Sequence, residues 1–520
     1  MLSIGPRFSL LIPKKRLTLA LVVFTLILLY WNWHTPALQS RVGSRTVQSV
    51  TVGPIASIFN QVPARGCTYP RFIFTAQERF LAGGALGGQL GEDDNDDPTA
   101  RARVGPNPQL QAGANYSVIY NFASPQPNAN SFRLVHYDGN DTYTDEPADI
   151  EELIDEDHIT YVTHATPEFL STNLIQLLDH WPSAPLSVSV FAPGQDFCAA
   201  TALISWLWTC EPRVRRQVSF HIIFPSDLAN DIAVKTATEG IRILDANCDQ
   251  APVLSEETFR SRKLIPYPVN TARNVARSVV RTKYFVTSDI ELFPSPNLSA
   301  NFVKFLSTSA QAHKLLENPE KSPVAFVLPI FEIAKNVPYP KNKAELVKLY
   351  NKNESVYFHA NFCRHCQRFP GLEEWVQPFK IRKDKKKRAK KIKAGESLTI
   401  SIAHVSKREP PYDRWEPIYI GTQDDPLYDE RLSWEGFQDK MSQMVELCLR
   451  NFTFAVLDNA YLIHKPGIKV KTSQDGKLTE PWRISFVERN EQVYQVLLKE
   501  LADKYGGLGH CKRVEPSTST

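Results

Sequence analysis

The chain has 520 residues, which is long enough for two to four domains or for one large α/β domain with insertions. Hydrophobic residues make up 42% and charged residues 22%, an ordinary globular composition that allows a sizeable core. The formal net charge of +4 is too small to indicate nucleic acid as a partner. Composition leaves the oligomeric state open.

The N-terminal part contains an apolar segment that predicts a membrane anchor. Residues 17–33 (LTLALVVFTLILLYWNW) are almost uninterruptedly apolar and follow a basic stretch. Because no small-residue cleavage site follows, the pattern favours an uncleaved signal-anchor over a signal peptide. The positive-inside rule then makes residues 1–16 a cytosolic tail and places everything beyond the anchor in the lumen. Residues 34–65 are polar and interrupted by prolines, so they predict a flexible stem for a lumenal domain of residues 66–512.

Sequons and cysteines agree with a lumenal domain that carries glycans and disulfides. Five N-x-S/T sequons are present, at Asn115, Asn140, Asn297, Asn353 and Asn451. The eight cysteines are an even number, which suits an oxidising compartment, although their pairing cannot be read from the sequence. The C-x-x-C at residues 363–366 has no second C-x-x-C at zinc-ribbon spacing, so it predicts a disulfide, local or to other cysteines.

Two charged runs predict disordered insertions, near residues 91–100 and 380–395. The first contains the acidic GEDDNDDP, which lacks the later Glu of an EF-hand calcium loop. The second contains the basic KIRKDKKKRAKKIK. In a lumenal domain, contact of this basic run with an anionic glycan or lipid is the alternative to a solvated insertion without a partner.

From residue 159 the chain alternates between strand and helix patterns. The predicted strands are 159–165, 186–192 and 218–224, and the predicted helices are 169–179 and 198–208. This alternation predicts an α/β fold with a mostly parallel central sheet flanked by helices. No phosphate loop or G-x-G-x-x-G fingerprint accompanies the strands, which disfavours P-loop nucleotidases and Rossmann-type enzymes.

The most informative stretch is 267–296, where a helical pattern leads into a short buried strand at 283–288. Asp289 and Glu291 follow directly at the carboxyl end of that strand. Open α/β sheets bind ligands at this edge, and carboxylates at positions i and i+2 can share one divalent cation there. The stretch therefore predicts a metal site.

The rest of the chain adds a helix, a strand and two aromatic clusters. A helix is predicted over 301–316 and one buried strand over 324–331. Residues 414–420 and 428–436 interleave aromatic rings with carboxylates, as sugar-binding sites commonly do, although ordinary packing gives the same pattern. His464 follows a strand-like run and precedes Lys-Pro-Gly, so it is expected to project from a strand end into a turn.

These segments together resemble glycosyltransferase family 49, the group of the β-1,4-glucuronyltransferases and the C-terminal domain of the LARGE enzymes. The resemblance is carried by YPVNTARNVAR at 267–277, the strand with its acidic pair, YDERLSWEGFQDK at 428–440 and HKPG at 464–467. The motifs occur in the family's order, and the resemblance spans roughly residues 150–470.

The resemblance implies a GT-A-type fold on a type II anchor, with the catalytic domain in the Golgi lumen. It also implies an inverting transfer of a sugar from a UDP-sugar with Mn²⁺ as cofactor. On matching positions, Asp289 and Glu291 stand for the metal-binding acidic motif and His464 for the third protein ligand. Arg273 and Asn274 stand for donor contacts, beside Asp289. Where the family usually has Asp at the third position of the motif, this chain has Glu291, which is one methylene longer and still able to ligate manganese.

Two further roles are expected from chemistry. Arg277 is a second basic group able to neutralise charge on the UDP pyrophosphate. Inversion needs a carboxylate base near the acceptor hydroxyl, and the candidates are Asp429, Glu430 and Glu435. Glu435 is favoured because the Trp-Glu-Gly turn presents its carboxylate beside a ring on which a sugar can stack.

The expected function is thus Mn²⁺-dependent transfer of a sugar, with glucuronate as the best assignment, from a UDP-sugar to a glycan or glycoprotein acceptor in the Golgi. Transfer of N-acetylglucosamine in a β-1,3 linkage is the alternative among enzymes of this type. A hypothesis of another class is a lumenal glycan-binding relative with weak catalysis, which Glu291 in place of the usual Asp allows. A third hypothesis is a metal-dependent hydrolase.

Overall fold

The structure is a computed structural model. It describes residues 116–125, 133–137, 155–226, 247–252, 254, 257–377, 399–469 and 481–511. All of them belong to one compact unit, Ala64–Thr520. The expected tail, anchor and stem lie outside the described residues, as do the insertions expected near 91–100 and 380–395. None of the described helices combines the length and the apolar character that a membrane span requires.

The larger sheet combines strands from almost the whole described chain. Its order is β11 (Ser401–Ser406), β13 (Thr453–Asp458), β8 (Val324–Leu328), β12 (Ile418–Gly421), β6 (Thr282–Thr287), β3 (Asp155–Ala165), β4 (Leu186–Phe191), β5 (Val218–Pro225), β1 (Tyr116–Ala123) and β2 (Arg133–Tyr137). The strands β6, β3, β4 and β5 are parallel, as is β13 to β8. The other neighbours are antiparallel.

The expectation of a mostly parallel sheet is therefore wrong, and the sheet is mixed. The strand β12 inserts antiparallel between β6 and β8, and β1 and β2 extend the far edge by antiparallel pairing. Alternation along the chain predicts the parallel βαβ units that are consecutive in sequence. It does not predict the direction of strands that join the sheet from distant segments.

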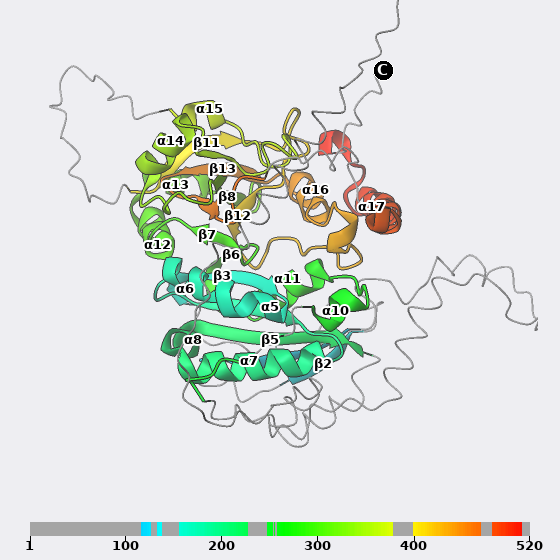
Figure 1. Ribbon diagram of the computed structural model, residues 1–520. Coiled ribbons are helices and arrows are strands. Elements are labelled where there is room, and N and C mark those ends of the chain that lie inside the picture. Colours follow the sequence, from blue (N-terminus) through cyan, green and yellow to red (C-terminus); the bar gives the residue numbers. More distant parts are fainter. Residues whose placement is uncertain are drawn as a thin grey trace, which may run out of the picture. The chain divides into compact units, whose positions relative to one another are not determined.

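The segments between these strands, and the segment after the last strand, form helices, and several of these helices pack on the sheet (Figure 1). They are α5 (Pro167–Phe169), a short π-helix (Leu170–Leu174), α6 (Ile175–His180), α7 (Asp196–Cys210), α8 (Pro212–Gln217), α10 (Phe259–Arg262), α11 (Val269–Ser278), α12 (Leu298–Thr308), α13 (Ala310–Leu315), α14 (Lys343–Asn351), α15 (Leu372–Trp375), α16 (Met441–Leu449) and α17 (Ile484–Tyr505). The helices expected at 169–179 and 198–208 are confirmed, and the first begins with the π-helix. The helix expected over 301–316 is divided into α12 and α13 at Ser309.

Alternation along β4 explains why α11 packs so closely on the sheet. Val188 and Val190 belong to the core that includes residues of α7, on one face. Ser187 and Ser189 alternate with them and face α11, where each hydroxyl donates to a carbonyl oxygen of that helix at 2.6 Å. Small side chains at these positions bring α11 close to the strands that lead to the candidate site.

A second, smaller sheet has the order β10 (Ser355–Tyr357), β9 (Ile330–Ile333), β14 (Leu462–His464) and β7 (Leu292–Pro294). Three chain segments pass from the larger sheet into this one: β6 into β7, β8 into β9, and β13 into β14. The single strand expected over 324–331 is wrong, because it breaks at Pro329, which has no amide hydrogen for a ladder. The carbonyl oxygen of Pro329 instead accepts from the Leu462 amide.

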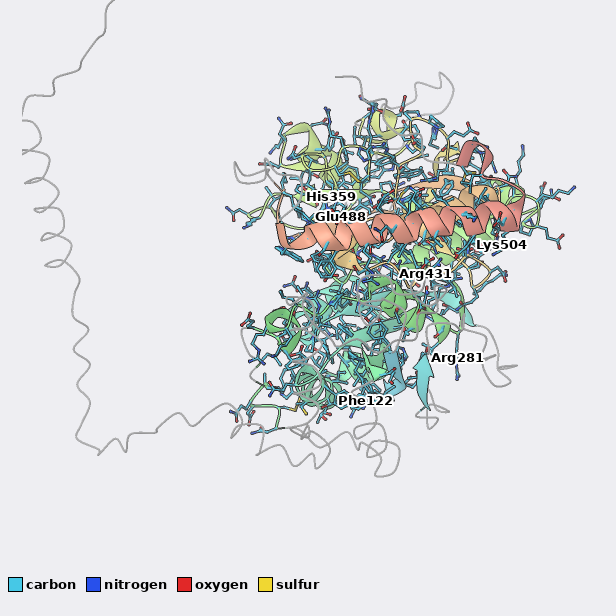
Figure 2. All side chains as sticks on the ribbon, turned by 90° about the vertical axis from the view of Figure 1, so that its right-hand side faces the viewer. Phe122, Arg281, His359, Arg431, Glu488 and Lys504 are labelled. Carbon is cyan, nitrogen blue, oxygen red and sulfur yellow. A yellow bond between two sulfur atoms is a disulfide. The ribbon has the colours of Figure 1, made fainter. Side chains whose placement is uncertain are left out.

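Three disulfides link segments among the described residues. The C-x-x-C forms a local disulfide between Cys363 and Cys366, which confirms the structural interpretation of that motif. A second bridge joins Cys210 to Cys248. A third joins Cys448, at the end of α16, to Cys511, beyond α17. Figure 2 shows α17 as one long helix across the viewed face, with Arg431 beside it.

Candidate active site

The acidic pair lies in the turn between β6 and β7, where the chain passes from one sheet to the other. Ile290 is buried, whereas the side chains of its neighbours Asp289 and Glu291 are 30% and 37% exposed. A hydrogen bond fixes the end of this turn: the Tyr161 hydroxyl on β3 donates to the Leu292 carbonyl oxygen at 2.5 Å. The buried residue thus anchors the turn, and the two carboxylates on either side of it remain accessible.

His464 lies beside Glu291, as the family resemblance implies. It is the last residue of β14 and pairs in antiparallel register with Leu292, the first residue of β7. Its Nε2 atom is 3.4 Å from Oε1 of Glu291. The ring is 2% exposed and lies against Phe358, with centroids 5.1 Å apart. Its Nδ1 atom is buried and has no hydrogen-bond partner among the described residues.

Asp289 faces three nitrogen-bearing side chains. Its Oδ1 atom is 3.3 Å from Nε2 of His164 and 3.4 Å from the guanidinium of Arg273, and Oδ2 is 3.9 Å from the Lys440 ammonium. Burial acts to raise the pKa of Asp289, but Lys440, His164 and Arg273 together hold it well below its usual value. Burial lowers the pKa of His164, so this imidazole is neutral at pH 7. Asp289 is therefore a firmly ionised carboxylate.

The three predicted metal ligands lie around one turn but do not form a closed cluster. Two triads within the described part of the chain place ligand atoms within 4.8 Å of one another, and neither includes Asp289. Both triads contain cysteines that are already joined in disulfides. Glu291 and His464 are thus the close pair, and Asp289 belongs to the cationic side of the same turn.

The helix α11 carries a buried polar stripe that explains the YPVNTARNVAR motif. The stripe recurs at the helical spacing i, i+3, i+4 and i+7 and consists of Asn270, Arg273, Asn274 and Arg277. Arg273 donates to Asp439 at 2.6 Å and to Asn270 at 2.9 Å, and its guanidinium lies over the Tyr428 ring. This stripe attaches the segment 422–440 to the larger sheet beside Asp289.

Asn274 and Arg277 are occupied by that segment. Asn274 donates to the Tyr428 carbonyl oxygen and to Glu430, and accepts from the Tyr428 amide. Arg277 is 2% exposed and donates to the carbonyl oxygens of residues 422, 423, 425 and 426. Of the predicted donor-side residues, Arg273 and Asp289 are brought together, whereas Asn274 and Arg277 hold the segment that covers α11.

The three carboxylates considered as bases all have strong partners. Asp429 accepts from Arg431 through both of its oxygens, and Glu430 accepts from Asn274 at 2.9 Å. Glu435 is 3% exposed, and it accepts from Arg260 at 2.5 Å and from the Tyr267 amide at 3.1 Å.

The turn Trp434–Gly436 has the opposite orientation to the one expected. Trp434 is 46% exposed, with the Arg483 guanidinium over its ring, whereas the Glu435 carboxylate points inward. Burial raises the pKa of Glu435, against the opposing charge of Arg260. Its contacts are those of a buried structural carboxylate.

Several residues at the site were missed in the sequence. His164 lies near the end of β3, the strand next to β6, so its place on the neighbouring strand end was a usable signal. Lys440 ends the family motif. Glu416 follows the buried Trp415 and precedes β12, which pairs with β6. No local pattern marks His359, whose pKa is lowered to about 3 by burial and by Lys469 and Lys440.

One buried carboxylate holds the strand ends of the smaller sheet in place. Glu332 on β9 is fully buried, and its two oxygens accept from the backbone amides of His359 and Lys469, at 3.2 and 3.0 Å. Glu332 lies opposite His464 in the parallel pairing of β9 with β14. It therefore fixes the chain that follows His464 against the loop that carries His359.

Comparison with known proteins gives a consistent set of relatives. The family model described as "Glycosyl-transferase for dystroglycan" matches residues 158–506. The chain is 30% identical over 355 residues to β-1,4-glucuronyltransferase 1 of Danio rerio, which covers 67% of this chain and 74% of that protein. The human β-1,4-glucuronyltransferase 1 is 28% identical over 364 residues, 68% of this chain and 78% of that protein. The mouse xylosyl- and glucuronyltransferase LARGE2 is 24% identical over 370 residues, 67% of this chain and 42% of that protein.

Proposed function

Because the chain belongs to glycosyltransferase family 49 and is a glycosyltransferase, we propose that it transfers glucuronate from a UDP-sugar to a glycan acceptor, with Mn²⁺ and with inversion. The observation that carries the metal-dependent part is the pairing of Glu291 with His464 at 3.4 Å, in the turn that Asp289 opens. Carboxylate oxygens and imidazole nitrogen suit manganese, with phosphate oxygens completing the coordination.

The donor set fits such an ion. Nε2 of His464 faces Oε1 of Glu291 at 3.4 Å, although Glu291 stands where the family usually has Asp. Glu291 and His464 would hold the ion, with Asp289 beside them. When bound, the ion supplies positive charge to the pyrophosphate as the bond between sugar and phosphate breaks.

The basic residues at the turn support an anionic donor sugar. Arg273 and Lys440 lie 3.4 and 3.9 Å from Asp289, so two cations border the proposed UDP site, and Arg273 is also paired with Asp439. A glucuronyl carboxylate needs such a cation, whereas a neutral sugar does not. The names of the relatives, which are glucuronyltransferases, point the same way.

The proposed setting is the Golgi lumen, on an uncleaved anchor formed by residues 17–33. Three disulfides among the described residues suit an oxidising compartment of the secretory route. The apolar run and its basic flank supply the anchor in this proposal.

A donor screen tests the function. The purified full chain is incubated with UDP-glucuronate, UDP-N-acetylglucosamine, UDP-xylose or UDP-glucose and a panel of short glycan acceptors, with Mn²⁺ present or chelated. The expected result is transfer that prefers UDP-glucuronate, requires Mn²⁺ and is lost in His464→Ala. His404→Ala, an exposed histidine on β11, is the matched control and keeps wild-type activity.

Three results would count against the proposal. UDP release that needs no acceptor would indicate a hydrolase. Mn²⁺-independent binding of glycan without turnover would indicate a binding protein. Transfer by His464→Ala at the wild-type rate would remove His464 from the metal site.

A further inference from the structure

Glu416 is placed at the candidate site by strand register. It lies just before β12, which pairs antiparallel with β6 through Ile420 opposite Val286 and Gly421 opposite Phe285. In antiparallel strands each step back along one strand is a step forward along the other. The chain preceding β12 therefore runs beside the carboxyl end of β6, where Asp289 and Glu291 follow.

The backbone of Glu416 is fixed. Its amide donates to the Cys366 carbonyl oxygen at 2.9 Å, and its carbonyl oxygen accepts from the side chain of Gln367 at 2.8 Å. Trp415, the preceding residue, is 1% exposed and lies against Phe454 in the core. The local disulfide between Cys363 and Cys366 stiffens the loop that holds this backbone. The main chain of Glu416 is thus preorganised.

Its side chain, by contrast, remains available. Glu416 is half-buried, and no described residue donates a hydrogen bond to its carboxylate. The charged groups that face it are Lys440, Asp439, Arg273 and Arg408. Of these, Lys440 and Arg273 also approach Asp289, so Glu416 and Asp289 border the same group of cations.

The other carboxylates near this cluster are already engaged. Oδ2 of Asp439 accepts from Arg273 at 2.6 Å, and both oxygens of Glu435 accept from the Tyr267 amide, with Oε1 also accepting from Arg260. A general base needs an accessible lone pair within hydrogen-bond reach of the acceptor hydroxyl. Of these three carboxylates, Glu416 is the one that combines access with a position beside the proposed metal.

We propose that Glu416 is the general base of the transfer reaction, a role that rests on the proposed function. Its carboxylate takes the proton of the acceptor hydroxyl while that oxygen attacks the anomeric carbon. A bond forms between the acceptor oxygen and the anomeric carbon, and the bond from that carbon to the phosphate oxygen breaks. The electron pair leaves with UDP, and Glu416 afterwards returns the proton to solvent. Burial raises the pKa of Glu416 to about 7, against the opposing effect of Lys440, which suits a base that works near neutral pH.

The test compares Glu416→Gln with Glu409→Gln in the full chain. Glu409 is an exposed carboxylate in the same segment and serves as the matched control. For Glu416→Gln we expect kcat to fall by about 10³-fold. The shift in melting temperature that UDP and Mn²⁺ produce is expected to stay within error of that of the wild type. Glu409→Gln should match the wild type in both measurements.

A second variant covers the case in which Glu416→Gln does not fold. Glu416→Asp keeps the charge on a shorter side chain, so a reduced rate is expected, with the acid limb of the kcat profile moved to a new pH. An unmoved limb with a wild-type rate would overturn the proposal, as would Glu416→Gln that transfers sugar within threefold of the wild type. If the wild-type chain transferred no sugar from any donor, the proposed function would fail and the base role with it. Transfer by the wild type and by Glu416→Gln at rates within threefold of each other would remove the base role alone.

Discussion

Oε1 of Glu291 lies 3.4 Å from Nε2 of His464, although 173 residues separate the two in the chain. The contact follows from the pairing of His464 with Leu292. Glu291 immediately precedes Leu292, so it lies at the same end of the paired strands as His464. The proposed metal site needs both the acidic turn and the histidine. The smaller sheet is the device that joins them.

The length of Glu291 should therefore matter for metal affinity. Shortening it in Glu291→Asp withdraws the carboxylate from His464, so the Mn²⁺ concentration for half-maximal transfer is expected to rise roughly tenfold. Glu291→Ala should raise it further. Glu317→Asp, an exposed site before β8, controls for the substitution itself. The measurement is a titration of the initial rate against the Mn²⁺ concentration. A lower half-maximal Mn²⁺ concentration for Glu291→Asp than for the wild type would contradict the expectation.

The ionised carboxylate of Glu416 is expected to lower the stability of the folded protein at neutral pH and above. Burial raises its pKa in the folded protein to about 7, from an unfolded value of about 4.5. A raised pKa of an acid favours folding below the unfolded value, and that contribution is lost as the pH rises through about 7. Glu416→Gln is therefore expected to melt at a higher temperature than the wild type at pH 8 and to lose this advantage near pH 4.5.

Thermal melts across that pH range measure the effect. Glu409→Gln should show no pH-dependent difference from the wild type, since Glu409 is exposed. A Glu416→Gln variant that is less stable than the wild type at pH 8 would show that the carboxylate stabilises the fold. Functional sites commonly hold such destabilising charges.

Arg277 is expected to stabilise the fold instead of acting on the donor. Arg277→Lys keeps the charge but leaves several of the carbonyl oxygens of the 422–426 turn without a donor. Each unsatisfied buried group costs about 1–3 kcal/mol, so the free energy of unfolding should fall by about 3 kcal/mol. Urea unfolding measures this change. Arg215→Lys, at an exposed position of α8, should change it by less than about 0.5 kcal/mol.

Glu435 is expected to behave as a structural residue. Glu435→Ala removes the acceptor of Arg260 and of the Tyr267 amide, so it should lower the free energy of unfolding by about 2 kcal/mol. At a temperature where the variant is folded, its turnover rate and the pH of its acid limb should equal those of the wild type. Turnover slowed by about 100-fold or more, with normal UDP binding, would restore Glu435 as the base.

The disulfide between Cys448 and Cys511 should stabilise more than the local one. It closes a loop across 63 residues, whereas the bridge between Cys363 and Cys366 closes one across 3 residues. By loop entropy, replacing both cysteines of the long loop with Ser costs about 4 kcal/mol, and the local pair less than half of that. Melting temperatures of the two double variants give the comparison, and an equal loss from both would contradict the entropic account.

The strands β3, β4 and β5 were predictable because β-branched and apolar runs are separated by helical patterns. His464 was predictable at a strand end for the same local reason. The split between β8 and β9 was signalled by Pro329 inside the apolar run. In each of these cases the deciding information lies within a few residues.

The role of Glu435 was not predictable, because its partners Arg260 and Tyr267 lie 175 and 168 residues earlier. The sequence shows a Trp-Glu-Gly turn but not which of its side chains points inward. Arg277 shows the same limit. Helical spacing correctly places it on the face of Arg273, yet the carbonyl oxygens that surround it come from a turn 145 to 149 residues later. Partners of this kind are set by tertiary structure.

The smaller sheet can be completed only late in synthesis, because its central strand β14 is made last. Its strand β7 is synthesised long before β14, which is inserted between β7 and β9. Until β14 arrives, β7 and β9 each lack a neighbour, and Glu291 lacks its histidine. A nascent chain therefore completes the proposed metal site only near the end of synthesis, so metal capture, if the proposal holds, should mark full-length molecules and not incomplete ones.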